Sequence, residues 1–127
     1  VATDHAPQSV MEKDVEFDRA ANGVVGLETA FSLVYGLVEE GLLTFNDLVK
    51  VMSLNPSKVM SLDKGTLKVG AAADIAIADL GAEWTVDPSM LKSKSKNTPY
   101  AGMVMKGKIV KTIVNGKVVF DCICRSL

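Results

Sequence analysis

The sequence contains few of the side chains that most often build metal sites and disulfide-stabilised folds. Its 127 residues include one histidine, His5, and two cysteines, Cys122 and Cys124. Two thiols fall short of the four ligands of a structural zinc site. We therefore interpret both cysteines as reduced thiols, which are typical of a reducing, cytoplasmic setting.

The sequence also lacks an excess of charge of one sign and any long hydrophobic run. It carries 14 basic and 15 acidic residues, for a net charge of -1. A nucleic-acid-binding surface needs a basic patch, and a membrane-spanning helix needs about 18 or more apolar residues in succession. We therefore expect neither a nucleic acid nor a membrane as a partner. The hydrophobic content of 48% fits one globular domain that packs against further protein.

The first forty residues divide into a short apolar start, a polar stretch and an amphipathic stretch. Residues 1–3 are apolar or β-branched and are expected to end a strand. The polar stretch 4–22 has little periodicity and is expected to be a loop. Apolar residues spaced three and four apart predict a helix over 26–40, and Gly41 would end it.

Two further helix starts are expected before residue 60. Thr44 is followed three residues later by Asp47, which resembles a capping box. Asn55-Pro56 combines an N-cap residue with a proline at the first helical position, and it predicts a third helix. The chain is therefore expected to be helical up to a boundary near residue 60.

The second half is expected to be a meander of five or six short strands. The pair Asn115-Gly116 between two apolar runs is the strongest hairpin signal in the sequence. Lys106-Gly107 is expected to be another turn. The strands that we predict are 74–79, 84–86, 103–105, 109–114 and 117–122.

Several short motifs occur in one order across almost the whole chain. The segments are Thr3-Asp4-His5-Ala6-Pro7, Glu12-Lys13, Gly26-Leu27-Glu28-Thr29, Asn55-Pro56-Ser57-Lys58, Lys64-Gly65-Thr66-Leu67, Gly70-Ala71-Ala72-Ala73-Asp74-Ile75, Ser95-Lys96-Asn97-Thr98-Pro99-Tyr100 and Thr112-Ile113-Val114-Asn115-Gly116-Lys117-Val118-Val119. With these motifs the chain resembles the C-terminal part of dihydroorotases of the long, bacterial type. The Gly-x-x-Ala-Asp-Ile and Val-Asn-Gly-Lys patterns occur throughout the wider amidohydrolase superfamily. Asp-His-Ala-Pro, Gly-Leu-Glu-Thr and Asn-Thr-Pro-Tyr are more particular to dihydroorotases.

The resemblance implies an α/β fold. Residues 1–60 would be the last strand, active-site loop and closing helices of a (β/α)8 barrel. Residues 61–127 would be the C-terminal half of a composite β-sandwich. It also implies a binuclear zinc site, of which most ligands lie outside this chain. We therefore expect the 127-residue chain alone to be inactive.

The resemblance assigns the proton-transfer role to Asp4. The family's reaction opens or closes a cyclic amide, interconverting dihydroorotate and N-carbamoyl-L-aspartate. Zinc polarises the carbonyl and lowers the pKa of bound water, and a neighbouring carboxylate carries the proton to the leaving nitrogen. Asp4 would contact the metal and take this role. Without the resemblance, Asp4 is equally a residue that caps a turn before Pro7.

The other candidate site residues are Gln8, Asn22 and Gly23, all implied to bind substrate. At Gln8 the family usually has a histidine that contacts the substrate carboxylate, and glutamine offers an amide donor without charge. Asn22 and Gly23 stand where the family uses backbone amides for the same carboxylate, although a plain turn is the alternative there. His5 is expected to be hydrogen-bonded in support of the loop.

Three functions therefore remain open at the level of sequence. The first is a zinc-dependent dihydroorotase of pyrimidine biosynthesis, expected as a homodimer that associates with another pyrimidine enzyme in some settings. The second is a hydantoinase-like or allantoinase-like cyclic amidase. The third is a non-catalytic, dihydroorotase-like structural partner, which the departure at Gln8 keeps in view. Glu28 and Thr29 are expected to support or pack the site.

Overall fold

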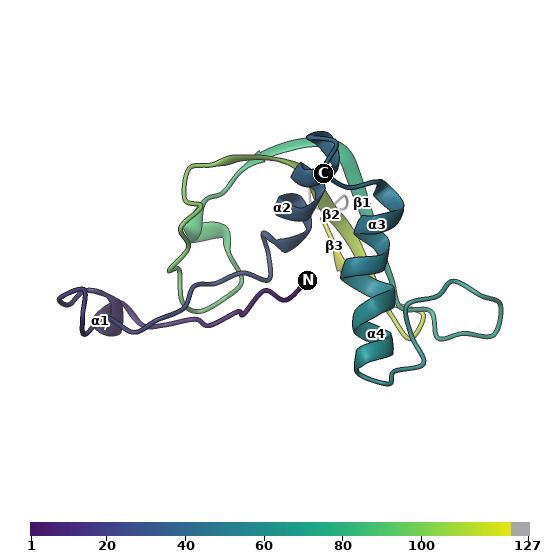
Figure 1. Cartoon of the computed structure of the whole chain (residues 1–127), viewed down its shortest axis with the longest axis horizontal. Coiled ribbons are helices and arrows are strands. Elements are labelled where there is room, and N and C mark those ends of the chain that lie inside the picture. The colour runs from purple at the N-terminus through teal and green to yellow at the C-terminus, as the bar shows by residue number, and fades with distance from the viewer. Residues whose placement is uncertain (123–127) are drawn as a thin grey trace.

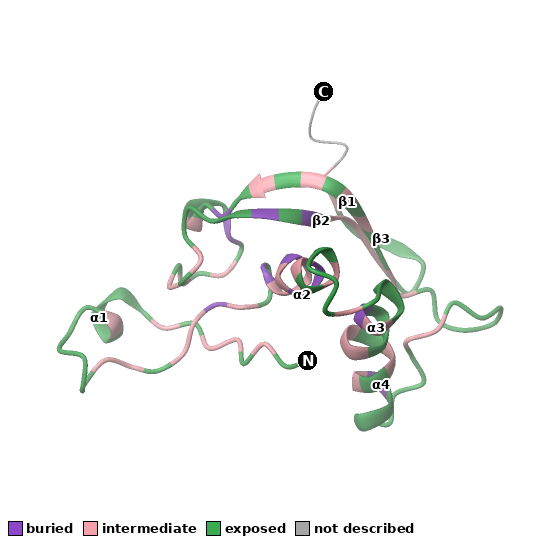
Figure 2. Cartoon of the chain, turned by 45° about the horizontal axis from the view of Figure 1, so that its top comes forward, coloured by how far each residue is buried: buried purple, intermediate pink, exposed green. Residues whose placement is uncertain are grey.

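The core of the molecule lies where one helix packs on a three-stranded sheet and on the helix that follows it in the chain. The computed structural model describes residues 1–122. Strands β1 (Ile75–Thr85), β2 (Val104–Val114) and β3 (Lys117–Asp121) form an antiparallel sheet in that order. Helix α2 (Ala30–Glu39) packs against the central strand, β2 (Figure 1). Figure 2 shows that the buried residues gather on α2 and on the part of β2 that faces it.

Helix α2 is fixed to the sheet by aromatic packing and by one polar cluster. Phe31 stacks on Tyr35 with ring centroids 6.0 Å apart. The Ser32 hydroxyl donates to the carbonyl of Gly107 at 2.5 Å, and the Trp84 indole N–H donates to both at 3.1 and 3.2 Å. The hydroxyl and the indole are therefore satisfied by hydrogen bonds where the helix meets the sheet.

An ion pair at the end of α2 adds a pH-dependent contact. Lys106 and the Tyr35 hydroxyl both donate to Glu39, and they hold the pKa of that carboxyl below its usual value. A lowered pKa means that the contact stabilises the fold at neutral pH and that this contribution is lost as the pH falls through the folded-state value. Because the Lys106 and Glu39 side chains are 44% and 39% exposed, the contribution of this ion pair to stability is small.

The remaining helices lie away from the sheet. Helix α1 (Val10–Lys13) sits on an exposed arm (Figure 2). Helix α3 (Phe45–Val49) continues through a π-helical stretch (Lys50–Leu54) into α4 (Asn55–Val59). A 3₁₀ turn (Pro88–Met90) lies between β1 and β2. None of the helices within residues 1–122 combines the length and apolarity needed to cross a lipid bilayer.

Several local predictions are confirmed. Thr44 caps α3 through a capping box with Asp47. Gly41 follows α2 with φ of 74°, the left-handed conformation that often ends a helix. Asn115 and Gly116 have φ of 48° and 75° and join β2 to β3, as a hairpin turn of this sequence requires.

The predicted third helix is present as α4, but Asn55 is not its N-cap. Asn55 is helical, and its backbone N–H donates to the carbonyl of Lys50, five residues earlier. A proline inside a helix removes one hydrogen bond and clashes with the preceding turn. The π-helical stretch before Pro56 widens that turn, so α3 and α4 form one continuous helical segment. The short helix α1 is a second difference, because Ser9 and Glu12 form a capping box within the predicted loop.

The prediction of five or six strands is also wrong. The expected strands 74–79 and 84–86 are one strand, β1, with a bulge where the Asp79 carboxylate accepts the N–H groups of Gly81 and Ala82. The expected turn at Lys106-Gly107 is instead an irregular position inside β2, where Gly107 has φ of 78°. Glycine adopts this conformation without steric cost, so the strand bends and continues.

The sequence predicted a strand end at residues 1–3 and two reduced thiols near the C-terminus. Residues 1–3 are not in a strand, because no strand within residues 1–122 pairs with them. The mixed helix-and-sheet class is confirmed, whereas the barrel, the composite sandwich and the division near residue 60 stay predictions. Cys122 is a free thiol, and Cys124 lies outside the described residues.

Candidate functional site

The candidate site forms where two loop segments, residues 3–8 and 22–27, run side by side (Figure 1). The backbone N–H of Ala6 donates to the carbonyl of Val24 at 2.9 Å. Gly23 has φ of 105°, and a Cβ on it would lie 2.4 Å from the Cβ of Ala6. The two segments can approach this closely only because position 23 has no side chain.

Asp4 is exposed and held in a left-handed backbone conformation, with φ of 45°. This conformation is uncommon for a residue with a side chain and costs about 1–3 kcal/mol. Within residues 1–122 the Asp4 carboxylate makes no hydrogen bond or ion pair. No capping bond of Asp4 to the turn before Pro7 is therefore present, and the carboxylate is available to a ligand.

His5 uses its ring to hold the second segment. Its Nδ1 accepts the backbone N–H of Gly26 at 3.1 Å and, more weakly, that of Leu27 at 3.4 Å. A ring whose Nδ1 is an acceptor carries its proton on Nε2 when neutral. These contacts agree with the supporting role expected of His5, and they leave no ring lone pair for a metal.

The structure brings Gln8, Asn22 and Gly23 together. The Gln8 side-chain amide donates to the carbonyl of Asn22 at 3.1 Å. The N–H groups of Asn22 and Gly23 have no acceptor within residues 1–122. In a trans peptide the C=O and N–H point in opposite directions, so the Gly23 N–H points away from the Gln8 amide. A ligand that touches both groups would require the Gln8 side chain to turn.

Asp4 is linked to this group only through the backbone. The isolated parallel bridge between His5 and Val24 joins the two segments between them. The four predicted site residues therefore belong to two paired segments, but the hydrogen bond from Gln8 joins only the stretch at Asn22 and not Asp4.

Three residues that form hydrogen bonds with Gln8 or Gly23 were not named as site residues from the sequence. Asn97 accepts the backbone N–H of Gln8 at 3.2 Å and donates to the carbonyl of Gly23 at 3.0 Å. Ser95 donates to the carbonyl of Gln8. Lys13 donates to the carbonyl of Gly23 at 3.2 Å. Asn97 and Ser95 stand inside a motif of the resemblance, but no local pattern shows that they reach back 87–89 positions.

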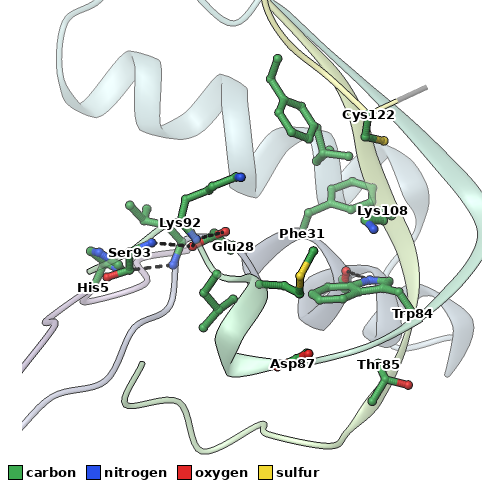
Figure 3. Close-up of a pocket in the computed structure, with 16 residues that line it drawn as sticks. His5, Glu28, Phe31, Trp84, Thr85, Asp87, Lys92, Ser93, Lys108 and Cys122 are labelled. Atoms are coloured by element: carbon green, nitrogen blue, oxygen red, sulfur yellow. Dashed lines mark hydrogen bonds between the residues drawn. The ribbon is translucent and has the colours of Figure 1, made fainter. Parts of the chain in front are cut away.

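A separate cavity of about 770 Å³ lies between α2, the sheet and residues 84–93 (Figure 3). Phe31, Trp84 and Leu91 are among its apolar walls. Its most prominent carboxylate, Glu28, already accepts the N–H groups of Lys92 and Ser93 at 2.8–3.1 Å. Asp4, Gln8, Asn22 and Gly23 do not line it.

A metal centre is not complete in the part of the chain that the structure describes. Residues 1–122 contain no group of three or more His, Cys, Asp or Glu side chains that could hold a metal ion. The unpaired carboxylate of Asp4 fits one oxygen ligand of zinc. A zinc site that uses Asp4 would therefore need further ligands from other protein residues.

Residues 1–119 match the amidohydrolase family. The chain belongs to the amidohydrolase family.

Its relatives include dihydroorotases. This amidohydrolase chain is 56% identical over 121 residues to the dihydroorotase of Anaeromyxobacter dehalogenans (strain 2CP-1 / ATCC BAA-258), a match that covers 95% of this chain and 28% of that protein. The resemblance inferred from the motifs is thereby confirmed. The chain spans a little more than a quarter of the length of this relative.

Solved structures of cyclic amidohydrolases share its fold. D-hydantoinase from Bacillus sp. AR9 matches with a TM-score of 0.84 and 26% identity, covering 94% of this amidohydrolase chain and 27% of that chain. The inactive dihydroorotase-like domain of the Chaetomium thermophilum CAD-like multifunctional protein matches with a TM-score of 0.56 and 26% identity, covering 76% and 26%. Both catalytic and inactive proteins therefore carry this arrangement.

Thr29 packs beneath the site and gives a first prediction. Its side chain is 2% exposed, and its hydroxyl has no partner within residues 1–122. We expect Thr29→Val to leave the free energy of unfolding unchanged or to raise it by about 1 kcal/mol, because a buried hydroxyl without a partner is replaced by a methyl group. Urea denaturation of the full-length protein that carries this chain would measure the change.

Thr44→Val is the matched control for this substitution. The Thr44 hydroxyl accepts the N–H of Asp47 at 3.2 Å and donates to its carboxylate at 2.6 Å. Losing this cap is expected to cost about 0.5–2 kcal/mol. An equal loss at position 29 would mean that the Thr29 hydroxyl has a partner in the folded protein.

Proposed function

We propose that the chain is the C-terminal part of a zinc-dependent dihydroorotase, which interconverts dihydroorotate and N-carbamoyl-L-aspartate. The observation that carries the proposal is the 56% identity to a dihydroorotase over 95% of the chain. The geometry supports it, because the two paired segments carry an unpaired carboxylate, that of Asp4, and two backbone N–H groups without an acceptor within residues 1–122. A homodimer and a cytoplasmic location belong to the proposal as well.

In this proposal Asp4 moves the proton that ring opening requires. Water adds to the amide carbonyl carbon, the C–N bond breaks, and the nitrogen leaves with a proton. Bound zinc would polarise the carbonyl and make water more acidic. The Asp4 carboxylate accepts the proton from the attacking water and returns it to the leaving nitrogen, which is general base followed by general acid catalysis. Because Asp4 is exposed and has no protein partner within residues 1–122, one carboxylate oxygen could contact the metal while the other transfers the proton.

The substrate carboxylate would be held mainly by backbone. Hydrogen bonds from N–H groups to a carboxylate are charge-assisted and stronger than neutral ones. The N–H groups of Asn22 and Gly23 fit this role, because neither is used within residues 1–122. Gln8 can add a neutral amide donor once it turns from the carbonyl of Asn22. Affinity for an anionic substrate would then rest on the backbone more than on a charged side chain.

Two other functions have specific observations in their favour. A hydantoinase-like cyclic amidase is supported by the structural match to D-hydantoinase. A non-catalytic partner is supported by the match to an inactive dihydroorotase-like domain and by the uncharged Gln8. Only the first of the three functions requires turnover of dihydroorotate.

An assay of the full-length protein separates the three functions. We expect zinc-dependent ring opening of dihydroorotate, which is measured as a loss of its absorbance. We also expect the activity to be lost after treatment with a chelator. Turnover of a 5-substituted hydantoin without turnover of dihydroorotate would support the second function instead. No turnover of either substrate with zinc bound would support the third. The 127-residue chain alone is the control and is expected to be inactive.

A further inference from the structure

A loop from the second half of the chain reaches the candidate site. We call residues 91–97 the bracing loop. The Glu28 carboxylate, just before α2, accepts the backbone N–H groups of Lys92 and Ser93 at 2.8–3.1 Å and holds one end of the loop. The Lys96 ammonium donates to two carbonyl groups of the same loop at 2.6 and 2.9 Å. The loop is therefore held by Glu28 at one end (Figure 3) and by Lys96 within itself.

Asn97, at the other end of the bracing loop, joins both segments of the site. Its Oδ1 accepts the backbone N–H of Gln8 at 3.2 Å, and its Nδ2 donates to the carbonyl of Gly23 at 3.0 Å. Its own backbone carbonyl accepts the N–H of Val25 at 3.1 Å. The Ser95 hydroxyl lies 2.8 Å from Oδ1 and shares its single proton between this oxygen and the carbonyl of Gln8, which favours the orientation of the amide that places Oδ1 on this side. One side chain therefore sets the distance between residue 8 and residue 23.

We propose that Asn97 is a positioning residue, which holds the backbone around Gly23 and Gln8 in the conformation that receives the substrate carboxylate. This inference rests on the proposed function of the site. Asn97 does not itself touch the N–H groups assigned to the substrate. Asn97 acts through the carbonyl of Gly23, which also accepts a hydrogen bond from the Lys13 ammonium at 3.2 Å. With the two donors in place, the backbone at Gly23 is preorganised, and ligand binding does not have to order it.

The consequence should be a change in KM with little change in kcat. In the full-length protein, Asn97→Ala is expected to raise the KM for dihydroorotate about 10-fold. A change of this size corresponds to losing the binding free energy of about one hydrogen bond. kcat should change less than about threefold, because Asp4 makes no hydrogen bond or ion pair with Asn97 or with the bracing loop within the described residues. Hydrogen–deuterium exchange should show faster exchange within residues 22–25 in the variant, at the Val25 N–H, which donates to the backbone carbonyl of residue 97.

Two further variants make the test specific. Ser95→Ala removes one donor to the Asn97 amide and should raise KM in the same direction by a smaller factor. If Asn97→Ala does not fold, the KM of Ser95→Ala tests the role of Asn97 instead. Asn46→Ala is the matched control, because Asn46 is exposed on α3 and its side chain has no hydrogen bond within residues 1–122. It should leave both KM and the exchange of residues 22–25 unchanged.

The outcomes separate this inference from the proposed function. A raised KM with faster exchange at residues 22–25 would support it. Unchanged exchange, or faster exchange with a fall in kcat alone, would overturn it. If the unmodified protein does not turn over dihydroorotate, the proposed function fails, and the exchange experiment alone decides whether Asn97 braces the two segments.

Discussion

Gly107→Ala is expected to lower the free energy of unfolding by about 2–5 kcal/mol, the largest loss of stability that we predict for a single methyl group. Gly107 lies in β2 with φ of 78°, where an L side chain is strained. A Cβ there would lie 2.7 Å from Cδ1 of Tyr35 and 3.3 Å from Cε1 of Phe31. The stacked rings of α2 would have to move away from the sheet, and the hydrogen bonds from Ser32 and Trp84 to the carbonyl of Gly107 would weaken.

Gly41→Ala isolates the packing part of this loss. Gly41 has φ of 74°, nearly the same as Gly107, but a Cβ there would meet nothing within 4 Å. This control should lose only the conformational cost, about 1–2 kcal/mol. Urea denaturation of the two variants in the full-length protein measures the difference. Equal losses would mean that α2 does not pack on Gly107 as the structure has it.

Local signals in the sequence predicted those parts of the fold that local interactions determine. The capping box of Thr44 and Asp47 involves residues three positions apart. The turn at Asn115-Gly116 needs only two residues that tolerate positive φ. In each case the residues that decide the conformation are neighbours in the chain, so their pattern can be recognised without knowledge of the tertiary structure.

The same kind of signal failed where tertiary contacts decide the outcome. Lys106-Gly107 has a sequence typical of a turn, yet the glycine serves the close approach of Tyr35, 72 positions earlier in the numbering. Asn55-Pro56 has the sequence of a helix start, yet the helix already runs through it from α3. Glycine and proline report an unusual backbone requirement, and they do not report whether its cause is a turn, a bulge or a widened helix.

The candidate site depended on family motifs for the same reason. Gln8, Asn22 and Gly23 were named from resemblance, and the structure places the Gln8 side chain in hydrogen-bond contact with the carbonyl of Asn22. Asn97 reaches them across 74–89 positions, a distance that no periodic pattern spans. The metal ligands could not be predicted from this sequence, because residues 1–122 supply no cluster that would hold an ion.

Asp4→Asn is expected to lower kcat for dihydroorotate by about 10²–10⁴-fold in the full-length protein, with a much smaller effect on KM. Asparagine matches aspartate in shape but cannot accept and return a proton at neutral pH. It also tolerates left-handed backbone conformations as well as aspartate does, so the φ of 45° at this position can be kept. Steady-state kinetics at saturating substrate, with the melting temperature as a check of folding, would measure the effect.

The substitution also decides between the two roles open to this residue. Asparagine caps a turn as well as aspartate does, so a residue that only capped the turn before Pro7 would leave Asp4→Asn close to full activity. Asp63→Asn is the matched control, because Asp63 is exposed and unpaired within residues 1–122 and does not line the candidate site. Loss of kcat at position 4 with retention at position 63 would assign proton transfer to Asp4. Retention at both would remove Asp4 from the reaction, and the unpaired carboxylate on the paired segments would then need another explanation.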